Sequence, residues 1–354
     1  MAIYILRRLL LMIPTLFGVM AVTFLVIQFV PGGPVERMVS LMEKGHDNGG
    51  GEVAASASVQ TGSYRGSKGL DPEQVAQLRH LYGFDQPPVA RFITMMWNYL
   101  RFDFGDSYYY HRSVVDLVVE KLPVSISLGI WSFLLTYLVS IPLGIRKAVR
   151  HQSRFDSWTS TVILTGYSIP GFVLGILLIV LFGGGSFWNL FPMRGLVSDY
   201  WNELPWIEKI LDYLWHMVLP ITASTVGSFA VMTMLTKNSF LEEIAKQYVL
   251  TARAKGLSEN AVLYRHVFRN AMIPLVTGFP GSFVAAFFSG SLLIETIFSL
   301  DGLGLLGYES VINRDYPVVM ATLYFFTLLG LLTKLLTDIT YVLVDPRITF
   351  EKAQ

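Results

Sequence analysis

The sequence predicts an all-α integral membrane protein with six transmembrane helices. Of its 354 residues, 53% are hydrophobic and only 15% are charged, whereas soluble domains carry roughly 25% charged residues. The apolar residues are also concentrated in six stretches that reach or approach the ~20 residues needed to cross a bilayer. These predicted spans are residues 9–30, 124–145, 158–182, 214–235, 274–298 and 318–343.

The first predicted span has a competing interpretation as a cleaved signal peptide, because Arg7 and Arg8 precede it. Its apolar run of about 22 residues exceeds the roughly 7 to 15 of a signal peptide's hydrophobic region. The sequence Pro31-Gly32-Gly33-Pro34 also stands where a small-residue cleavage site would be. We therefore expect a retained helix.

Basic residues orient the predicted spans, since Lys and Arg next to a span resist translocation. The segment 146–157 holds four basic residues and one acid, and 236–273 holds six basic residues and three acids. The alternate segments are acidic, because 183–213 has two basic residues against four acids and 299–317 has one against three. The two basic segments, and with them both chain termini, are predicted to be cytoplasmic.

This arrangement divides the chain into four predicted parts: a cytoplasmic tip with the first helix, an extended periplasmic segment, a core and a cytoplasmic tail. They comprise residues 1–30, 31–123, 124–345 and 346–354.

The periplasmic segment is predicted to begin with a flexible, Gly-, Ser- and Ala-rich part near residues 43–69. A helix is predicted from Asp71-Pro72-Glu73, and a second amphipathic stretch covers 89–102. A docking surface for an external partner and a lid of short helices are two interpretations of this segment that the sequence leaves open.

The sequence lacks the motifs of common catalytic and metal sites. It has no Cys, no G-x-x-x-x-G-K-[ST], H-E-x-x-H or G-x-S-x-G motif, and its six His residues are scattered. We therefore expect no catalytic residue, no metal site and no ATP hydrolysis on this chain. The net charge of +1 also argues against nucleic acid as a partner.

Three ionisable residues fall inside predicted spans, where a charge is costly and often functional. Lys334 and Asp338 lie four residues apart on one helix face and are expected to pair with each other. Glu295 lies near the outer end of the fifth span. For Glu295 a structural tether is favoured over contact with a substrate.

Small residues repeat every four positions in the fifth predicted span, at Gly278, Ser282, Ala286 and Gly290, with Gly281, Ala285 and Ser289 beside them. Such a face either packs closely on another helix or lines a wide pathway. The candidate path or gate residues are Ser282, Ala286, Ser289, Gly290 and Glu295.

The cytoplasmic segment 237–273 is too polar to cross a membrane and carries two helical patterns. The first is predicted to run from Ser239, with Glu242 as its capping-box partner, to Lys255, and Gly256 is predicted to end it. Ser258 is predicted to begin the second helix. The apolar stripes of the two helices are Phe240, Leu241, Ile244, Tyr248 and Val249, and then Val262, Leu263, Val267 and Phe268. The pattern predicts a compact helix-turn-helix elbow.

This segment and several others resemble a known family. The run Tyr248-Val249-Leu250-Thr251-Ala252-Arg253-Ala254-Lys255-Gly256-Leu257-Ser258, followed by His266-Val267-Phe268-Arg269-Asn270-Ala271-Met272-Ile273-Pro274, resembles the coupling-loop signature of permease subunits in ABC importers of the dipeptide, oligopeptide and nickel group. The resemblance continues through Arg7-Arg8-Leu9, Tyr82-Gly83-Phe84-Asp85-Gln86-Pro87, Phe104-Gly105-Asp106-Ser107, Leu122-Pro123, Glu295-Thr296-Ile297-Phe298, Gly302-Leu303-Gly304 and Arg314-Asp315-Tyr316-Pro317. The Gly-rich insertion near 43–69 is similar to that of the Yej-type subgroup, peptide permeases implicated in microcin C uptake.

The resemblance implies the type I ABC importer permease fold and a place in the bacterial inner membrane. It implies that a periplasmic peptide-binding protein delivers substrate, that a second homologous permease subunit completes the path, and that ABC ATPase subunits, separate or fused, bind ATP and Mg²⁺. The chain itself would bind no cofactor. The residues implied to couple to the ATPase are Tyr248, Thr251, Ala252, Arg253, Ala254, Lys255, Gly256, Leu257 and Ser258.

The segment departs from the general permease motif E-A-A-x-x-x-G in two respects. Ala252 and Gly256 occupy its small positions, where bulk would block docking, but Leu250 stands in place of the Glu. Pro274 also lies farther from Gly256 than in the general pattern. The sequence does not identify which basic residue would contact the ATPase.

Peptide import is the leading hypothesis, and a nickel or metal-chelate permease of the same architecture is the second. An ion-coupled carrier and a membrane scaffold without a pathway are alternatives from other classes. The sequence shows neither a duplicated half nor a carboxylate at the middle of a span, both of which are typical of ion-coupled carriers.

Overall fold

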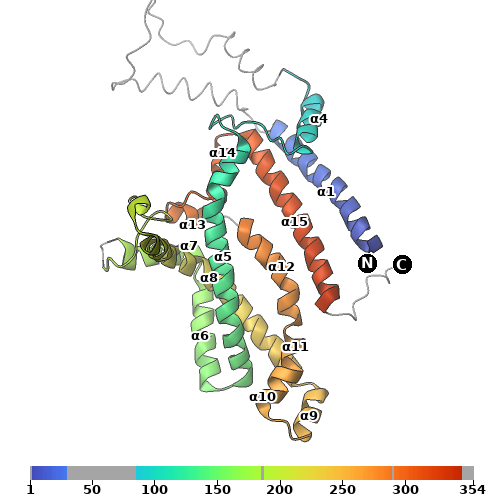
Figure 1. The fold of residues 1–354 in the computed structure, drawn as a ribbon, viewed down its shortest axis with the longest axis vertical. Helices are drawn as coiled ribbons and strands as arrows, with labels where there is room; N and C mark the ends of the chain where they lie inside the picture. The colour runs from blue at the N-terminus through green and yellow to red at the C-terminus, as the bar shows by residue number, and fades with distance from the viewer. Residues whose placement is uncertain (1, 30–84, 185–186, 289–290, 345–354) are drawn as a thin grey trace, which may run out of the picture. The chain divides into compact units, whose positions relative to one another are not determined.

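The computed structural model describes residues 2–29, 85–184, 187–288 and 291–344 (Figure 1). The regular structure in these ranges is helical, apart from one isolated bridge between Asp106 and Ser113. The helices are α1 (Ala2–Phe29), α4 (Pro88–Tyr99), α5 (Val114–Val149), α6 (Arg154–Ser168), α7 (Gly171–Leu178), α8 (Trp206–Ile244), α9 (Gln247–Ala254), α10 (Glu259–Val262), α11 (Phe268–Ala271), α12 (Ile273–Phe288), α13 (Leu292–Ile297), α14 (Leu303–Ile312) and α15 (Tyr316–Val344). The predicted flexible part near 43–69 and the helix predicted from Asp71 lie outside the described residues.

Four helices are long and apolar enough to cross a membrane, namely α1, α5, α8 and α15. The helices α6 and α7, with the π-helical turn Ile179–Gly183 that follows, would make a fifth span if counted as one, but the chain bends by 93° between them. Six crossings therefore stay a prediction, and so does the third span over 158–182, which the structure shows as two helices joined at a bend. The bend falls at Pro170, the residue before α7, which has no N–H to continue the ladder of α6.

The fifth predicted span, 274–298, is also divided in the structure. It contains α12 and the separate short helix α13. Ser291 has an extended backbone, and its N–H donates to the carboxylate of Glu295 at 3.1 Å, so α13 begins as a new helix there. Proline alone does not decide where helices end, since α8 continues through Pro220 and α12 through Pro280.

The described chain forms two compact units. One contains Val118–Leu306 with the described parts of Met1–Ile13 and Phe326–Gln354, and the other contains the described parts of Pro14–Leu117 with Gly307–Phe325. A core of the first unit combines Leu128 of α5, Met217 and Ile221 of α8, and Ile294 and Phe298 at α13. In Figure 1, α6 runs beside α5, and α9 to α11 lie at the end of α8.

Small residues bring helices of the first unit close together. A Cβ added to Gly129 of α5 would overlap the carbonyl oxygen of Ala286 on α12, and one added to Gly171 of α7 would lie 2.7 Å from the carbonyl oxygen of Ala223 on α8. By contrast, Gly278 has open space where its Cβ would be. The small residues of α12 therefore serve close packing at Ala286 but not along the whole stripe.

In the second unit, two segments that carry the family resemblance meet around a buried carboxylate. Asp315 accepts a hydrogen bond from the Ser107 hydroxyl and one from the backbone N–H of Tyr108 at 3.0 Å. Burial raises the pKa of this carboxyl above its usual range. Beside it, the ring of Phe104 packs on Tyr99, with centroids 4.7 Å apart. The predicted amphipathic stretch over 89–102 is confirmed as the helix α4 as far as Tyr99, where the helix ends.

Candidate functional site

The first candidate site is the elbow, defined here as residues 245–271, which contains α9, α10 and α11. The predicted turn after α9 is confirmed, because Gly256 has φ +81°, a conformation that favours glycine. Its N–H bonds the carbonyl of Arg253 at 2.9 Å, and the N–H of Leu257 bonds that of Ala252 at 3.4 Å. These two bonds form a Schellman motif. Ser258 then caps α10, since its hydroxyl accepts from the N–H of Ala261.

The predicted start of the first elbow helix is wrong. Ser239 and Glu242 are not a capping box, because both lie inside α8, which continues to Ile244. The chain turns instead at Lys246, whose backbone is extended, and α9 begins at Gln247. The apolar pattern around Phe240 has the same helical period whether these residues end α8 or begin a separate elbow helix. The pattern alone therefore does not show where α8 ends.

The elbow has its own hydrophobic core, which joins it to two long helices. Phe240 of α8, Val249 of α9 and Val267 are fully buried together, and Ala148 near the end of α5 belongs to the same cluster. Both predicted apolar stripes take part in this packing, as core residues or as partly buried neighbours. A displacement of the elbow would therefore act directly on α5 and α8, because packed interiors transmit strain.

Polar contacts fix the elbow at its junction with α8. The Tyr248 hydroxyl donates to the carboxylate of Glu243 at 2.5 Å, and the side-chain amide of Asn270 donates to that hydroxyl at 3.2 Å. Lys246 forms an ion pair with the same Glu243. Burial and the bond to Glu243 raise the pKa of Tyr248. The contacts join α8, α9 and the segment around α11.

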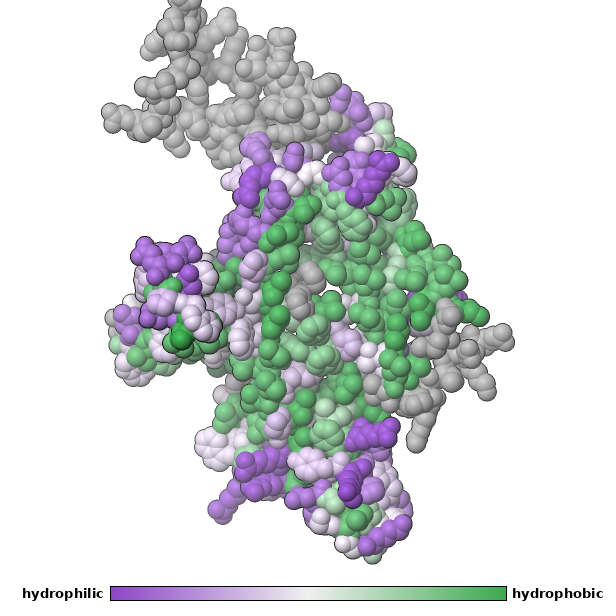
Figure 2. All heavy atoms as spheres, in the orientation of Figure 1, coloured by the Kyte–Doolittle hydropathy of each residue, from purple (hydrophilic) through white to green (hydrophobic). Residues whose placement is uncertain are grey.

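The outer surface of the elbow carries most of the predicted coupling residues. Seven of the nine are exposed: Thr251, Arg253, Ala254, Lys255, Gly256, Leu257 and Ser258. Leu250, which departs from the general motif, is also 56% exposed. Ala252 is 6% exposed and belongs to the elbow core, and Tyr248 is half-buried. Ala252 is therefore small because of packing inside the elbow. Figure 2 shows hydrophilic side chains gathered at the elbow, in purple, below the apolar α12.

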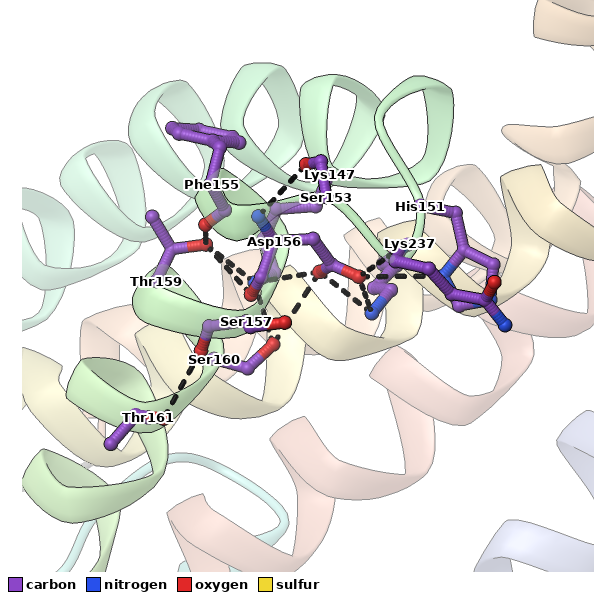
Figure 3. A network of polar contacts seen from close by, with 11 residues as sticks. Lys147, His151, Ser153, Phe155, Asp156, Ser157, Thr159, Ser160, Thr161 and Lys237 are labelled. Atoms are coloured by element: carbon purple, nitrogen blue, oxygen red, sulfur yellow. Dashed lines mark hydrogen bonds and ion pairs between the residues drawn. The ribbon is translucent and has the colours of Figure 1, made fainter.

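A buried ionic cluster, which sequence reasoning missed, joins α5, α6 and α8 (Figure 3). Asp156 is 4% exposed and accepts two bonds from Lys237, at 2.7 and 2.8 Å. Lys147 is fully buried; its ammonium group lies 3.1 Å from the same carboxylate and donates to the Thr159 hydroxyl at 2.7 Å. The sequence indicated only that these lysines flank spans, which is equally true of exposed cations.

The second candidate site is a cavity of about 880 Å³ in the first unit, lined by residues of α5, α6, α7, α8, α12 and α13. Ser282 and Ala286, two of the predicted path residues, line it, and so do Ser132, Thr136 and Tyr137 of α5. The α5 residues were missed because isolated hydroxyls in an apolar helix give no distinctive pattern. Two further predicted path residues, Ser289 and Gly290, lie outside the described residues.

Glu295 is fully buried and does not line the cavity. Its carboxylate accepts from the N–H of Ser291 and, at 2.7 Å, from that of Leu305 at the start of α14. Gly302 packs against this carboxylate so closely that an added Cβ would lie 2.5 Å from its carbon. These bonds agree with the tether interpretation.

The predicted pairing of Lys334 with Asp338 is wrong within the described residues. Asp338 instead forms an ion pair with Arg8 of α1 at 2.9 Å and accepts from the Tyr4 hydroxyl at 2.9 Å. A partner on another helix was available, and spacing within one helix cannot reveal it.

Comparison with known proteins shows that this chain is similar to components of transport systems. Residues 140–350 match the family described as binding-protein-dependent transport system inner membrane component. The chain is 58% identical to the peptidoglycan transport system permease protein YejB of Agrobacterium fabrum, with 99% of each chain covered. It is 56% identical to the inner membrane ABC transporter permease protein YejB of Escherichia coli O157:H7 (99% of this chain, 100% of the relative) and 34% identical to the dipeptide transport system permease protein DppB of Escherichia coli K12 (99% of each).

Proposed function

Because the chain belongs to the family of inner-membrane components of binding-protein-dependent transport systems, we propose that it is the permease subunit of an ATP-driven importer of peptides. A periplasmic binding protein would deliver the peptide, and a second homologous permease subunit would complete the path. ATP and Mg²⁺ would be bound by ABC ATPase subunits, separate or fused, below the elbow. The localisation is the bacterial inner membrane, with both termini cytoplasmic.

One observation carries the coupling part of this proposal. The elbow exposes a continuous segment from Arg253 to Ser258 while its core is continuous with the ends of α5 and α8. A protein docked on this surface can therefore move the elbow and the attached ends of α5 and α8 together as one rigid unit. The cluster around Asp156 extends the connection to α6. ATP-driven movement of the docked ATPase would therefore shift three helices around the cavity.

The names of the relatives support two substrate classes. Dipeptide transport is named for the relative at 34% identity, and peptidoglycan transport for the one at 58%. Peptidoglycan consists of sugars and short peptides, so its peptide-containing fragments are the second candidate. Microcin C-like peptides would be further candidates among the peptides. In either case Ser282 and Ala286 are proposed to contribute to the path, with Glu295 as the tether between α13 and α14.

The experiment is uptake by the assembled complex in proteoliposomes, with the binding protein outside and ATP inside. Gly256→Glu is expected to abolish uptake and substrate-stimulated ATP hydrolysis, because a long charged side chain would occupy the docking surface. Uptake by the unmodified complex should continue when the proton gradient is collapsed and stop when ATP is removed.

The matched control is Gly256→Asn. The φ of +81° strains any side chain at this position, but Asn tolerates the left-handed region better than most residues. No atom lies within 4 Å of an added Cβ, so neither variant creates a clash inside the chain. Asn should retain most of the uptake. Normal uptake by the Glu variant would refute docking at this turn.

A further inference from the structure

The wall of the 880 Å³ cavity is uncharged. Its described lining consists of apolar, aromatic, glycine and hydroxyl-bearing residues, and includes no Asp, Glu, Lys, Arg or His. A charged wall would attract solutes of one sign and repel those of the other. This cavity therefore offers no means of selecting a substrate by charge, and its polar contacts are hydroxyl groups.

Three hydroxyls on this wall, those of Ser132, Thr136 and Tyr137, are buried and have no hydrogen-bond partner within the described part of the chain. Thr136 as a whole is only 4% exposed. Other hydroxyls in the same unit donate to the carbonyl four residues earlier, as hydroxyls in helices commonly do. Thr222 and Thr277 do so outside the cavity lining, and Ser224 does so on the cavity wall itself. An unsatisfied buried hydroxyl is costly and calls for an explanation.

The next hydroxyl along the same face of α5 supplies that explanation. Ser132, Thr136 and Ser140 follow each other at intervals of four residues, so they share one face of the helix. Ser140 donates to the backbone carbonyl of Phe229 on α8 at 3.1 Å. This face thus bonds a peptide carbonyl where a neighbouring helix provides one. At the cavity, the hydroxyls of Ser132 and Thr136 have no hydrogen-bond partner within the described residues.

We propose that Ser132 and Thr136, with Ser282 of α12 on the same cavity, form a recognition site for the main chain of a transported peptide. A hydroxyl both donates and accepts, and every peptide unit presents an N–H and a C=O. Such a site binds the N–H and C=O groups that all peptides share and does not discriminate between peptides by side-chain charge. The inference rests on the proposed function and adds to it the substrate feature that the cavity recognises.

The first test is the pair Thr136→Val and Thr136→Ser in the reconstituted complex, with neutral, acidic and basic tripeptides and saturating binding protein. Val removes the hydroxyl at nearly constant volume, and uptake of all three peptides should fall by a similar factor, about three- to tenfold for one hydrogen bond. Ser keeps the hydroxyl and should retain uptake. Thr222→Val, on α8 outside the cavity lining, should have no effect. Unchanged uptake by Thr136→Val, or loss for one charge class alone, would overturn the proposal.

The second test does not depend on Thr136 and uses the absence of cysteine from the chain. In Ser282→Cys, a thiol reagent should block uptake, and the neutral tripeptide should slow the labelling during turnover. Ser157→Cys, exposed on α6, should be labelled with no effect on uptake. Labelling of Ser282→Cys that neither blocks uptake nor responds to peptide would exclude the cavity as the recognition site. If the unmodified complex moved no peptide at all, the proposed function itself would fail, so the two failures are distinguishable.

Discussion

At the scale of single residues, Asp156 holds together a cluster with more positive than negative charge. One buried carboxylate faces the ammonium groups of Lys147 and Lys237. Its remaining lone pairs are used by the N–H of Gln152 at 3.2 Å and by the His151 ring. Removal of the carboxylate would leave two buried cations without compensation, whereas removal of one lysine would leave an intact pair.

We therefore expect Asp156→Asn to destabilise the protein by about 3 kcal/mol or more, the cost of breaking a buried ion pair from one side. Lys237→Met should cost clearly less, because Lys147 still neutralises Asp156. The control is Arg253→Gln, which breaks the exposed pair with Glu259 and should cost at most about 1 kcal/mol. The measurement is the thermal unfolding midpoint of the purified complex at one scan rate. Equal midpoints for Asp156→Asn and Lys237→Met would contradict this ranking.

The role of a residue can be predicted from the sequence where it depends on local structure, such as a helix end. It cannot be predicted where it depends on a partner far away in the chain. Gly256 and Ser258 were predicted correctly because a helix end requires particular residue types at particular places. Asp338 was assigned to the wrong cation because Arg8, its partner in the structure, lies more than 300 residues away. Thr136 gave no signal, since the sequence does not show whether a hydroxyl in an apolar helix finds a hydrogen-bond partner.

At the scale of elements, the elbow is a packed body with a polar junction to α8. Its hydrophobic core would persist without the Tyr248 hydroxyl, because Phe240, Val249 and Val267 do not depend on it. The hydroxyl connects Glu243 of α8 to Asn270 of α11, so we expect it to help fix the angle between the elbow and the long helix. Stability and coupling can thus be separated at this residue.

Tyr248→Phe is expected to leave assembly and basal ATP hydrolysis unchanged and to reduce stimulation by substrate-loaded binding protein several-fold. The physical reason is that Asn270 loses its acceptor and the junction loosens, while the ring keeps its packing. Tyr264→Phe serves as the matched control, since that ring belongs to the same elbow and is 61% exposed. The assay is ATP hydrolysis by the complex in nanodiscs. Full stimulation with Phe at position 248 would show that the hydroxyl has no role in coupling.

At the scale of the whole molecule, hydrophobicity predicts where apolar helices occur but not whether each continues. The predicted spans at α1, α5, α8 and α15 correspond to long helices. The third and fifth are divided, because Pro170 interrupts one and the Glu295 carboxylate binds the N–H of Ser291 in the other. Both breaks depend on a backbone detail that a hydrophobicity average does not contain.

The orientation of the helices follows from loop charge and can be tested with single cysteines, because the chain has none of its own. Arg150 and Lys255 are exposed in the segments predicted to be cytoplasmic, and Asn202 is exposed in a segment predicted to be periplasmic. A membrane-impermeant maleimide added to intact spheroplasts should label Asn202→Cys and should reach Arg150→Cys and Lys255→Cys only after permeabilisation. Labelling of Lys255→Cys from outside would place the elbow beyond the reach of a cytoplasmic ATPase. Equal access to Asn202 and Lys255 in intact cells would mean that α8 does not cross the membrane, and the mechanism of coupling through α8 would fail with it.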